Sequence, residues 1–187
     1  ANYGKKAILD GSMGANGITT GDHLEFIQAT VDTKSSPVGG YEVLIKEAST
    51  RSMIEGNVGL STQIIDQEEQ ITVVEGGKTL NFVTSAGDTV ETTMNKLEKA
   101  LKASGLNLDL LRDPGMATEP NQPQFLVFRH KEFGSEPSFQ VASNTPGLLS
   151  KDGDVPVLVQ NGVDVSGTIG GEFAQGKGQI LTGSEPT

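Results

Sequence analysis

The chain has 187 residues, a formal net charge of −10 and no cysteine. The acidic balance gives a surface that repels phosphate, which disfavours nucleic acid and anionic membrane surfaces as partners. The lack of cysteine excludes a disulfide framework and thiolate chemistry. The 24 glycines, the absence of Trp and an aromatic content of 5% indicate a turn-rich β protein with a core of Val, Ile and Leu.

The chain starts at Ala1 without a Met and without the apolar segment of a secretory signal. No stretch approaches the roughly 18 apolar residues that a membrane span requires. These features suggest a soluble piece of a longer protein whose export signal is encoded elsewhere.

Alternating apolar runs separated by Gly, Pro and Asp clusters predict antiparallel strands. The first two runs cover 23–30 and 41–47, on either side of a connection at 34–40 that contains a proline and paired glycines. Runs at 70–74 and 79–83 flank Gly76 and Gly77, which can supply the positive φ of a tight hairpin turn. The sequence therefore predicts two strands followed by a β-hairpin.

One principal helix is predicted at about 88–104. Asp88 can cap its start, with Glu91 three residues later, and Gly105 ends it. Apolar residues follow at spacings of four, three and four: Val90, Met94, Leu97 and Leu101. This spacing predicts one buried helical face.

Further strand-like runs follow at 106–110, 125–129, 138–142, 155–160, 163–169 and 178–181. We therefore expect an elongated α+β fold, mainly β, with antiparallel sheets and two closely joined subdomains. No sustained apolar heptad is present, so the chain is expected to stay monomeric or weakly associated and to form no filament alone.

The segment from Gly171 to Lys177 has the spacing of a phosphate-binding loop, but Gly178 stands where a Ser or Thr is required. The residues after it read as a strand, whereas phosphate binding requires a helix N-terminus. A glycine-rich β-turn is the favoured interpretation.

Metal binding is not favoured. His23 and His130 are far apart in sequence, and each is expected to be an exposed strand residue. Asp152, Asp154 and Asp164 suggest calcium, but they lack the ligand alternation that ends in a bidentate Glu.

Catalysis is not favoured either. The acidic residues Glu68, Glu69, Glu91, Asp109 and Asp113 could include a glycosidase pair, but a solvated acidic surface is the favoured interpretation. We therefore expect no enzyme activity and assign no catalytic, metal or cofactor-binding residue, and no cofactor.

Three stretches together resemble bacterial flagellins and their filament relatives. Gly4 to Ser12 resembles the segment where flagellin leaves its helical core. The block 70–142 resembles the hook IN unit, with Asn95-Lys96 where the Ile-Asn pair is expected. The segments 162–172 and 176–183 resemble glycine-containing motifs of the same proteins. In addition, 39–45 resembles a strand of the filament cap protein.

The resemblance implies the variable, surface-exposed outer region of a flagellin, a secreted structural protein of the extracellular flagellar filament that takes part in motility. It implies a connection to a missing helical core at 1–18, a proximal β subdomain at 19–69 plus 143–187, and a distal hook IN-like subdomain at 70–142. The segments 4–12 and 178–183 would then lie together at one end of the molecule, with 70–142 at the other.

Neighbouring flagellin subunits are the expected partners, mainly through helices outside this chain, with host antibodies or glycans as further candidates. A cap or hook-associated protein fragment is the alternative within the structural class. A glycan-binding, adhesin-like module is the alternative outside it, although the low aromatic content argues against a sugar-binding platform.

Overall fold

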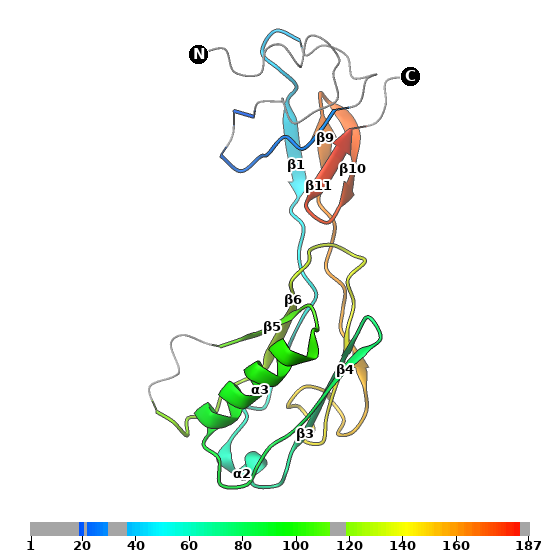
Figure 1. The fold of residues 1–187 in the computed structure, drawn as a ribbon. Helices are drawn as coiled ribbons and strands as arrows, with labels where there is room; N and C mark the ends of the chain where they lie inside the picture. Colours follow the sequence, from blue (N-terminus) through cyan, green and yellow to red (C-terminus); the bar gives the residue numbers. More distant parts are fainter. Residues whose placement is uncertain (1–18, 21, 30–36, 113–118, 184–187) are drawn as a thin grey trace. The chain divides into compact units, whose positions relative to one another are not determined.

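The computed structural model describes residues 19–20, 22–29, 37–112 and 119–183. The chain divides into two compact units (Figure 1). The described residues of the smaller unit are 19–20, 22–29, 37–46, 166–176 and 181–183, and the last three of these ranges contribute strands to one sheet. The larger unit comprises residues 47–165 and 177–180. The predicted segment 1–18 and the proposed neighbourhood of 4–12 fall outside the described residues.

The predicted α+β fold, mainly β with one principal helix, is confirmed. In the smaller unit the strand order is β1 (Val43–Glu47), β9 (Ser166–Ile169), β10 (Glu172–Lys177) and β11 (Ile180–Gly183). The larger unit has two antiparallel sheets and the helices α2 (Thr62–Ile65) and α3 (Val90–Ser104). Neither of these helices is long and apolar enough to cross a bilayer, a finding that covers only the described residues.

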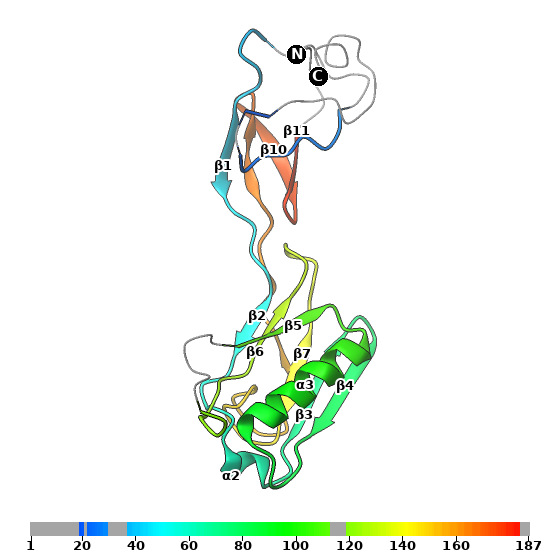
Figure 2. The ribbon, with the colours of Figure 1, turned by 60° about the vertical axis from the view of Figure 1, so that its left-hand side comes forward.

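One sheet of the larger unit has three strands in the order β2 (Met53–Glu55), β6 (Val127–His130) and β5 (Leu108–Leu111). The other sheet has four, in the order β4 (Lys78–Val83), β3 (Gln70–Glu75), β7 (Gln140–Ser143) and β8 (Val157–Leu158). Figure 2 shows α3 lying across β3 and β4 in the view turned by 60°.

The hairpin β3–β4 forms as predicted. Gly76 and Gly77 have φ values of 56° and 78°, the left-handed pair that a two-residue type I′ turn requires. The register is continuous from the Glu75–Lys78 pair to the Gln70–Val83 pair. The local sequence therefore fixes both the turn and the strand pairing.

Helix α3 begins one residue later than the predicted cap. Thr89, not Asp88, is the N-cap, and its hydroxyl accepts a hydrogen bond of 3.1 Å from the Thr92 amide. The Asp88 carboxylate instead forms an ion pair of 2.6 Å with Lys96. Gly105 ends the helix in the left-handed region at φ 69°, as predicted.

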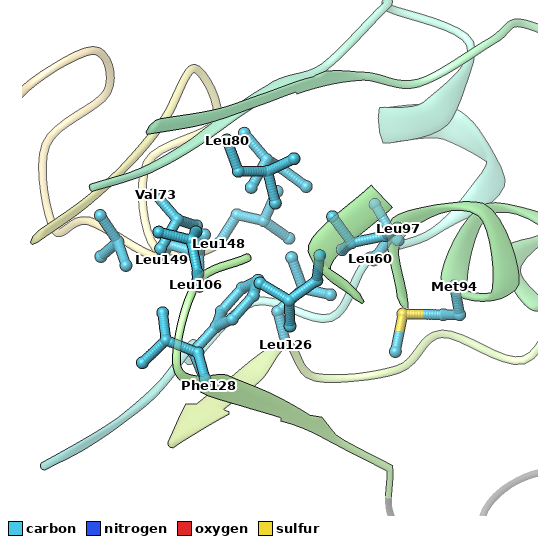
Figure 3. Packing of buried hydrophobic residues seen from close by; sticks show 14 of the residues in the cluster. Leu60, Val73, Leu80, Met94, Leu97, Leu106, Leu126, Phe128, Leu148 and Leu149 are labelled. Carbon is cyan, nitrogen blue, oxygen red and sulfur yellow. The ribbon is translucent and has the colours of Figure 1, made fainter. Parts of the chain in front are cut away.

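The predicted buried face of the helix is confirmed: Val90, Met94, Leu97 and Leu101 are each at most 2% exposed. They belong to a single apolar cluster with residues from both sheets of the larger unit, among them Leu80, Phe128 and Val141. Loop residues such as Leu148 complete the cluster (Figure 3). The helix therefore unites the two sheets over one core.

Two predicted elements are wrong. The segment 23–29 forms no strand, although its apolar residues alternate. Leu24 and Ile27 are 37% and 53% exposed. Alternation alone is not sufficient for a strand, because a strand also requires a neighbouring strand to pair with. The segment 172–177, predicted as a turn, is strand β10, and the turns lie on either side of it at 170–171 and 178–179.

The pattern of apolar residues in the sequence did not predict β2 or α2, which are three and four residues long. The predicted strands at 106–110, 125–129, 138–142 and 155–160 correspond to β5, β6, β7 and β8, with ends shifted by one or two residues.

The division into units differs from the predicted subdomain boundaries at 70 and 142. Residues 47–69 and 143–165 group with the 70–142 block in the larger unit. The physical reason is pairing and burial: β2 pairs with β6, β8 pairs with β7, and Leu60 and Leu148 are fully buried in the common core.

Replacing Leu97 with Ala tests the role of α3 in the core. The fully buried side chain would leave a cavity, so Leu97→Ala is expected to lower the free energy of unfolding by about 2–5 kcal/mol. Lys99→Ala, on the exposed side of the same helix, should change it by less than about 0.5 kcal/mol. Urea unfolding followed by circular dichroism measures both. Equal stabilities of the two variants would contradict the packing.

Candidate functional site

The carboxylate most enclosed by the fold is Glu69, which the sequence analysis included among the candidate glycosidase acids. It is 2% exposed. Its Oε1 accepts hydrogen bonds from the amides of Asn144 (2.6 Å) and Thr145 (3.1 Å). Its Oε2 accepts from the Thr145 amide (3.1 Å) and hydroxyl (2.6 Å). These bonds hold the loop after β7 against the start of β3, so Glu69 acts as a structural clamp.

Removing the charge of Glu69 should loosen this loop. Charge-assisted hydrogen bonds in a buried site contribute more than neutral ones, so Glu69→Gln is expected to lower the free energy of unfolding by about 1.5–3 kcal/mol. The neighbouring Glu68 is exposed, and Glu68→Gln should stay within about 0.5 kcal/mol of the parent. Urea unfolding compares the two. A Glu69→Gln variant as stable as Glu68→Gln would rule out the clamp.

A second carboxylate, Asp164, joins two segments of the larger unit that are distant in sequence. Its Oδ1 accepts from the Gly178 amide (2.7 Å) and the Ser135 amide (3.2 Å), and its Oδ2 accepts from the Ser135 hydroxyl (2.5 Å). Gly134, at φ 109°, packs so closely against Asp164 and Gly178 that a side chain there would overlap both. The Gly-containing motifs thus meet in one tight contact.

The loop beside Asp164 is held from its other side as well. The Gly134 amide donates to the Thr50 carbonyl at 2.9 Å. The Arg51 guanidinium lies 4.1 Å from the centre of the Phe133 ring, within cation–π distance. Packing and backbone geometry therefore account for residues 133–135.

Asp164 gives a pH dependence that can be measured. Hydrogen bonds from the Ser135 hydroxyl, the Gly178 amide and the Ser135 amide hold the pKa of the Asp164 carboxyl below its ordinary value of 3.8. A lowered acid pKa stabilises the fold above the unfolded-state pKa, and that stabilisation is lost as pH falls through the folded-state pKa.

Unfolding curves between about pH 2 and 6 should therefore differ between the parent chain and Asp164→Asn. In the parent chain, the stabilisation from the ionised Asp164 carboxylate is lost as the pH falls. Asp164→Asn lacks that stabilisation at every pH, so the two curves of unfolding free energy converge at low pH. Asp152→Asn, at an exposed site, is the control and should run parallel to the parent. A constant offset between the parent and Asp164→Asn across this range would contradict the assignment.

His130 is a strand residue as predicted, but its predicted exposure is wrong. It lies in β6, the central strand of its sheet, and is 2% exposed. Its Nδ1 accepts a hydrogen bond of 3.0 Å from the Glu132 amide, which places the proton of a neutral ring on Nε2. The Nε2 lies 3.5 Å from Glu75 Oε1. His23 is exposed and lies outside any strand.

The remaining predicted residues occupy separate places. Glu91 is exposed in the first turn of α3, and Asp109 on β5 lies 3.7 Å from Arg129. Asp154 adopts a positive φ of 60° in the loop before β8. Asp113 falls outside the described residues. Within the described ranges, no group of three or more His, Asp or Glu side chains is arranged to hold a metal ion.

The phosphate-loop spacing at 171–177 does not give a phosphate site. Glu172 to Lys177 form strand β10, which is followed by a turn and β11, so no helix N-terminus points at the loop. Lys177 pairs with Glu136 at 3.1 Å, and both side chains are at least 70% exposed.

Two hollows lie on the surface that the described residues of the larger unit form. One hollow, of about 330 Å³, is lined by Phe133, Pro137, Ile180 and the charged residues Glu136 and Lys177. The other, of about 290 Å³, lies beside His130 and Glu75. In both, the central titratable groups already have intramolecular partners, Gly178 and Ser135 for Asp164 and Glu132 for His130.

Sequence reasoning missed the role of Glu69 because its partners, Asn144 and Thr145, lie far away in sequence. It missed the burial of His130 because the strands on either side of β6, β2 and β5, come from other parts of the chain. A weak signal was present for His130, which alternates with Phe128 and Leu126 along an apolar strand.

The fold defines a class: a mainly antiparallel β protein of two units. In the larger unit one principal helix packs against two sheets over a single core, and the carboxylates of Glu69 and Asp164 hold loops by hydrogen bonds. No protein-family model matches the chain, and no curated protein matches its sequence. Solved structures of similar fold include flagellar cap proteins. The D2–D3 domains of the cap protein FliD from Serratia marcescens match in two crystal forms, both with TM-score 0.50.

Identity to the two Serratia structures is 13% and 11%. The matches cover 76% and 78% of this chain and 82% and 88% of theirs. FliD from Bdellovibrio bacteriovorus matches with TM-score 0.45 and 12% identity over 74% of this chain and 76% of that one. At 13% and 11% identity, the likeness to the two Serratia structures establishes the fold alone, which is similar to that of the D2–D3 domains of a flagellar cap protein.

Proposed function

We propose that this chain is the outer part of a flagellar cap protein, with an extracellular structural role at the flagellum. The observation that carries the proposal is the match to the D2–D3 domains of the Serratia cap protein, which covers more than three quarters of this chain and more than four fifths of each Serratia chain. Because the identity is low, the match supports the fold, and the function is inferred from it.

The sequence analysis favoured flagellin and gave the cap protein as the alternative. The fold comparison favours the alternative. The segment 39–45, which resembles a cap-protein strand, contains the start of β1. The most flagellin-like segment, Gly4 to Ser12, lies outside the described residues, so it adds no structural support to flagellin.

The proposal includes no catalysis. The buried side chains of Glu69 and His130 and the half-buried side chain of Asp164 each bind backbone groups of their own chain. Side chains used in this way fix loops and are not poised toward a substrate. The partners we propose are neighbouring flagellar subunits, because a cap domain works within an assembly.

Immunogold electron microscopy with antibodies against this 187-residue chain tests the proposal. On cells that carry the gene, we expect label confined to the filament tip. Label along the whole filament would overturn the cap assignment in favour of flagellin. Label absent from flagella would overturn both. Cells with the gene deleted provide the control for specificity.

A further inference from the structure

One face of the four-stranded sheet in the larger unit carries no charged side chain. Directly paired residues of neighbouring strands share a face, and the opposite face packs on the core and α3. The residues that point away from the core form what we call the neutral sheet face: Gln70, Thr72, Val74, Thr79, Asn81, Val83, Gln140, Ala142 and Leu158. In a chain with 20% charged residues and net charge −10, such a face is unusual.

The neutral sheet face is open to solvent at its two outer strands. Val83 on β4 is 53% exposed and Leu158 on β8 is 63% exposed. Thr79 and Asn81 on β4 are exposed as well. Large apolar side chains on an uncharged surface favour contact with another protein over solvent.

Strand β4 forms one edge of this sheet, and its backbone is regular. In a hairpin with a two-residue turn, the two residues that flank the turn form a hydrogen-bonded pair, and every second pair after it is also hydrogen-bonded. In this hairpin the hydrogen-bonded pairs are therefore Glu75–Lys78, Val73–Leu80 and Ile71–Phe82. The Thr84 amide, which donates to the Glu69 carbonyl at 3.0 Å, continues this alternation. The backbone groups of Thr79, Asn81 and Val83 therefore point outward, and no backbone bond to them is found among the described residues.

The usual protections of an edge strand are missing from β4. The strand has six residues without a proline, and its register with β3 is continuous, without a bulge. Its one charged residue, Lys78, stands at its start and donates to the Gly105 carbonyl of its own chain at 2.7 Å. The stretch from Thr79 to Val83 thus offers an uncharged, hydrogen-bonding edge.

We propose that the β4 edge pairs with β4 of a second copy of this chain, antiparallel, across a two-fold axis at Asn81. In this register Asn81 lies opposite Asn81 of the other copy, and Thr79 lies opposite Val83 in both halves. Each of these pairs exchanges two backbone hydrogen bonds, so every outward backbone group of the three residues is satisfied. The two four-stranded sheets become one continuous sheet.

The charge distribution argues for a second copy as the occupant. Two chains of net charge −10 repel one another, so their contact is favoured where neither presents a charge. The edge from Thr79 to Val83 meets that condition, and its register is complementary to itself. Pairing through a backbone edge alone, without a new apolar core, gives weak association, which local concentration in an assembly would strengthen.

Sedimentation velocity of the 187-residue chain over a range of concentrations tests the pairing. We expect a concentration-dependent dimer. Asn81→Asp and Asn81→Lys each place like charges directly opposite at the two-fold axis, so each should raise the dimer dissociation constant about tenfold or more. An equal mixture of the two variants should restore the dimer as a heterodimer. Circular-dichroism melting checks that both remain folded.

Gln140→Asp is the matched control, because Gln140 lies on the neutral sheet face but on the inner strand β7. It should leave the dimer intact. Loss of the dimer in this variant, as strong as in Asn81→Asp, would indicate face-to-face stacking and overturn edge pairing. Monomers at all concentrations, or no rescue in the mixture, would also overturn it.

A cysteine variant gives a second measurement. The chain has no cysteine, so Asn81→Cys carries a single thiol. Directly hydrogen-bonded partners in an antiparallel pair have Cα atoms about 5.5 Å apart, within the range of a disulfide. Mild oxidation should link Asn81→Cys into dimers much faster than Gln140→Cys, and equal rates would contradict the proposed register. This inference does not depend on the proposed flagellar function.

Discussion

Burial of one face of α3 is the interaction on which the larger unit depends. The two sheets of this unit are short and share no strand, so neither could bury an apolar face alone. Met94 and Leu97 fill the space between them, together with Phe128 from one sheet and Val73 from the other. A chain without cysteine has no covalent staple to replace this packing, and the helix therefore determines whether the two sheets form one unit.

Carboxylates fix the loops that this core leaves at the surface. Glu69 and Asp164 each bind backbone amides from segments distant in sequence, and both do so from the end of a strand or close to one. A carboxylate can accept several hydrogen bonds at once, so one residue holds a whole turn. In an acidic chain this use explains why some acidic residues are enclosed while most remain on a solvated surface. It also accounts for the closely packed glycines, because Gly134 and Gly178 let the backbones approach the same carboxylate.

The parts of the fold that could be predicted are those whose cause is local. The Gly76-Gly77 turn and the Gly105 helix end each follow from a backbone conformation that glycine adopts readily. Strand β2 could not be predicted, because its three residues are a strand only through pairing with β6. The roles of Glu69 and His130 could not be predicted for a similar reason. The partners of Glu69 lie far away in sequence, and the strands on either side of His130 come from other parts of the chain. At 23–29 the alternation of apolar residues predicted a strand that does not form, since periodicity does not provide a strand to pair with.

The distribution of charge over the described part of the larger unit is uneven. The exposed side of α3 carries Glu91, Lys96, Glu98, Lys99 and Lys102. Opposite charges alternate there and form pairs such as Lys102 with Glu98 at 2.6 Å, so this side is well solvated. The neutral sheet face has no such residues. Charged side chains on an edge strand commonly prevent it from pairing with another chain. The chain contains 24 acidic residues, yet none of them lies on β4. Because charge is plentiful on the helix and absent from Thr79 to Val83, the uncharged part of this edge agrees with the proposed pairing better than with a role in solubility.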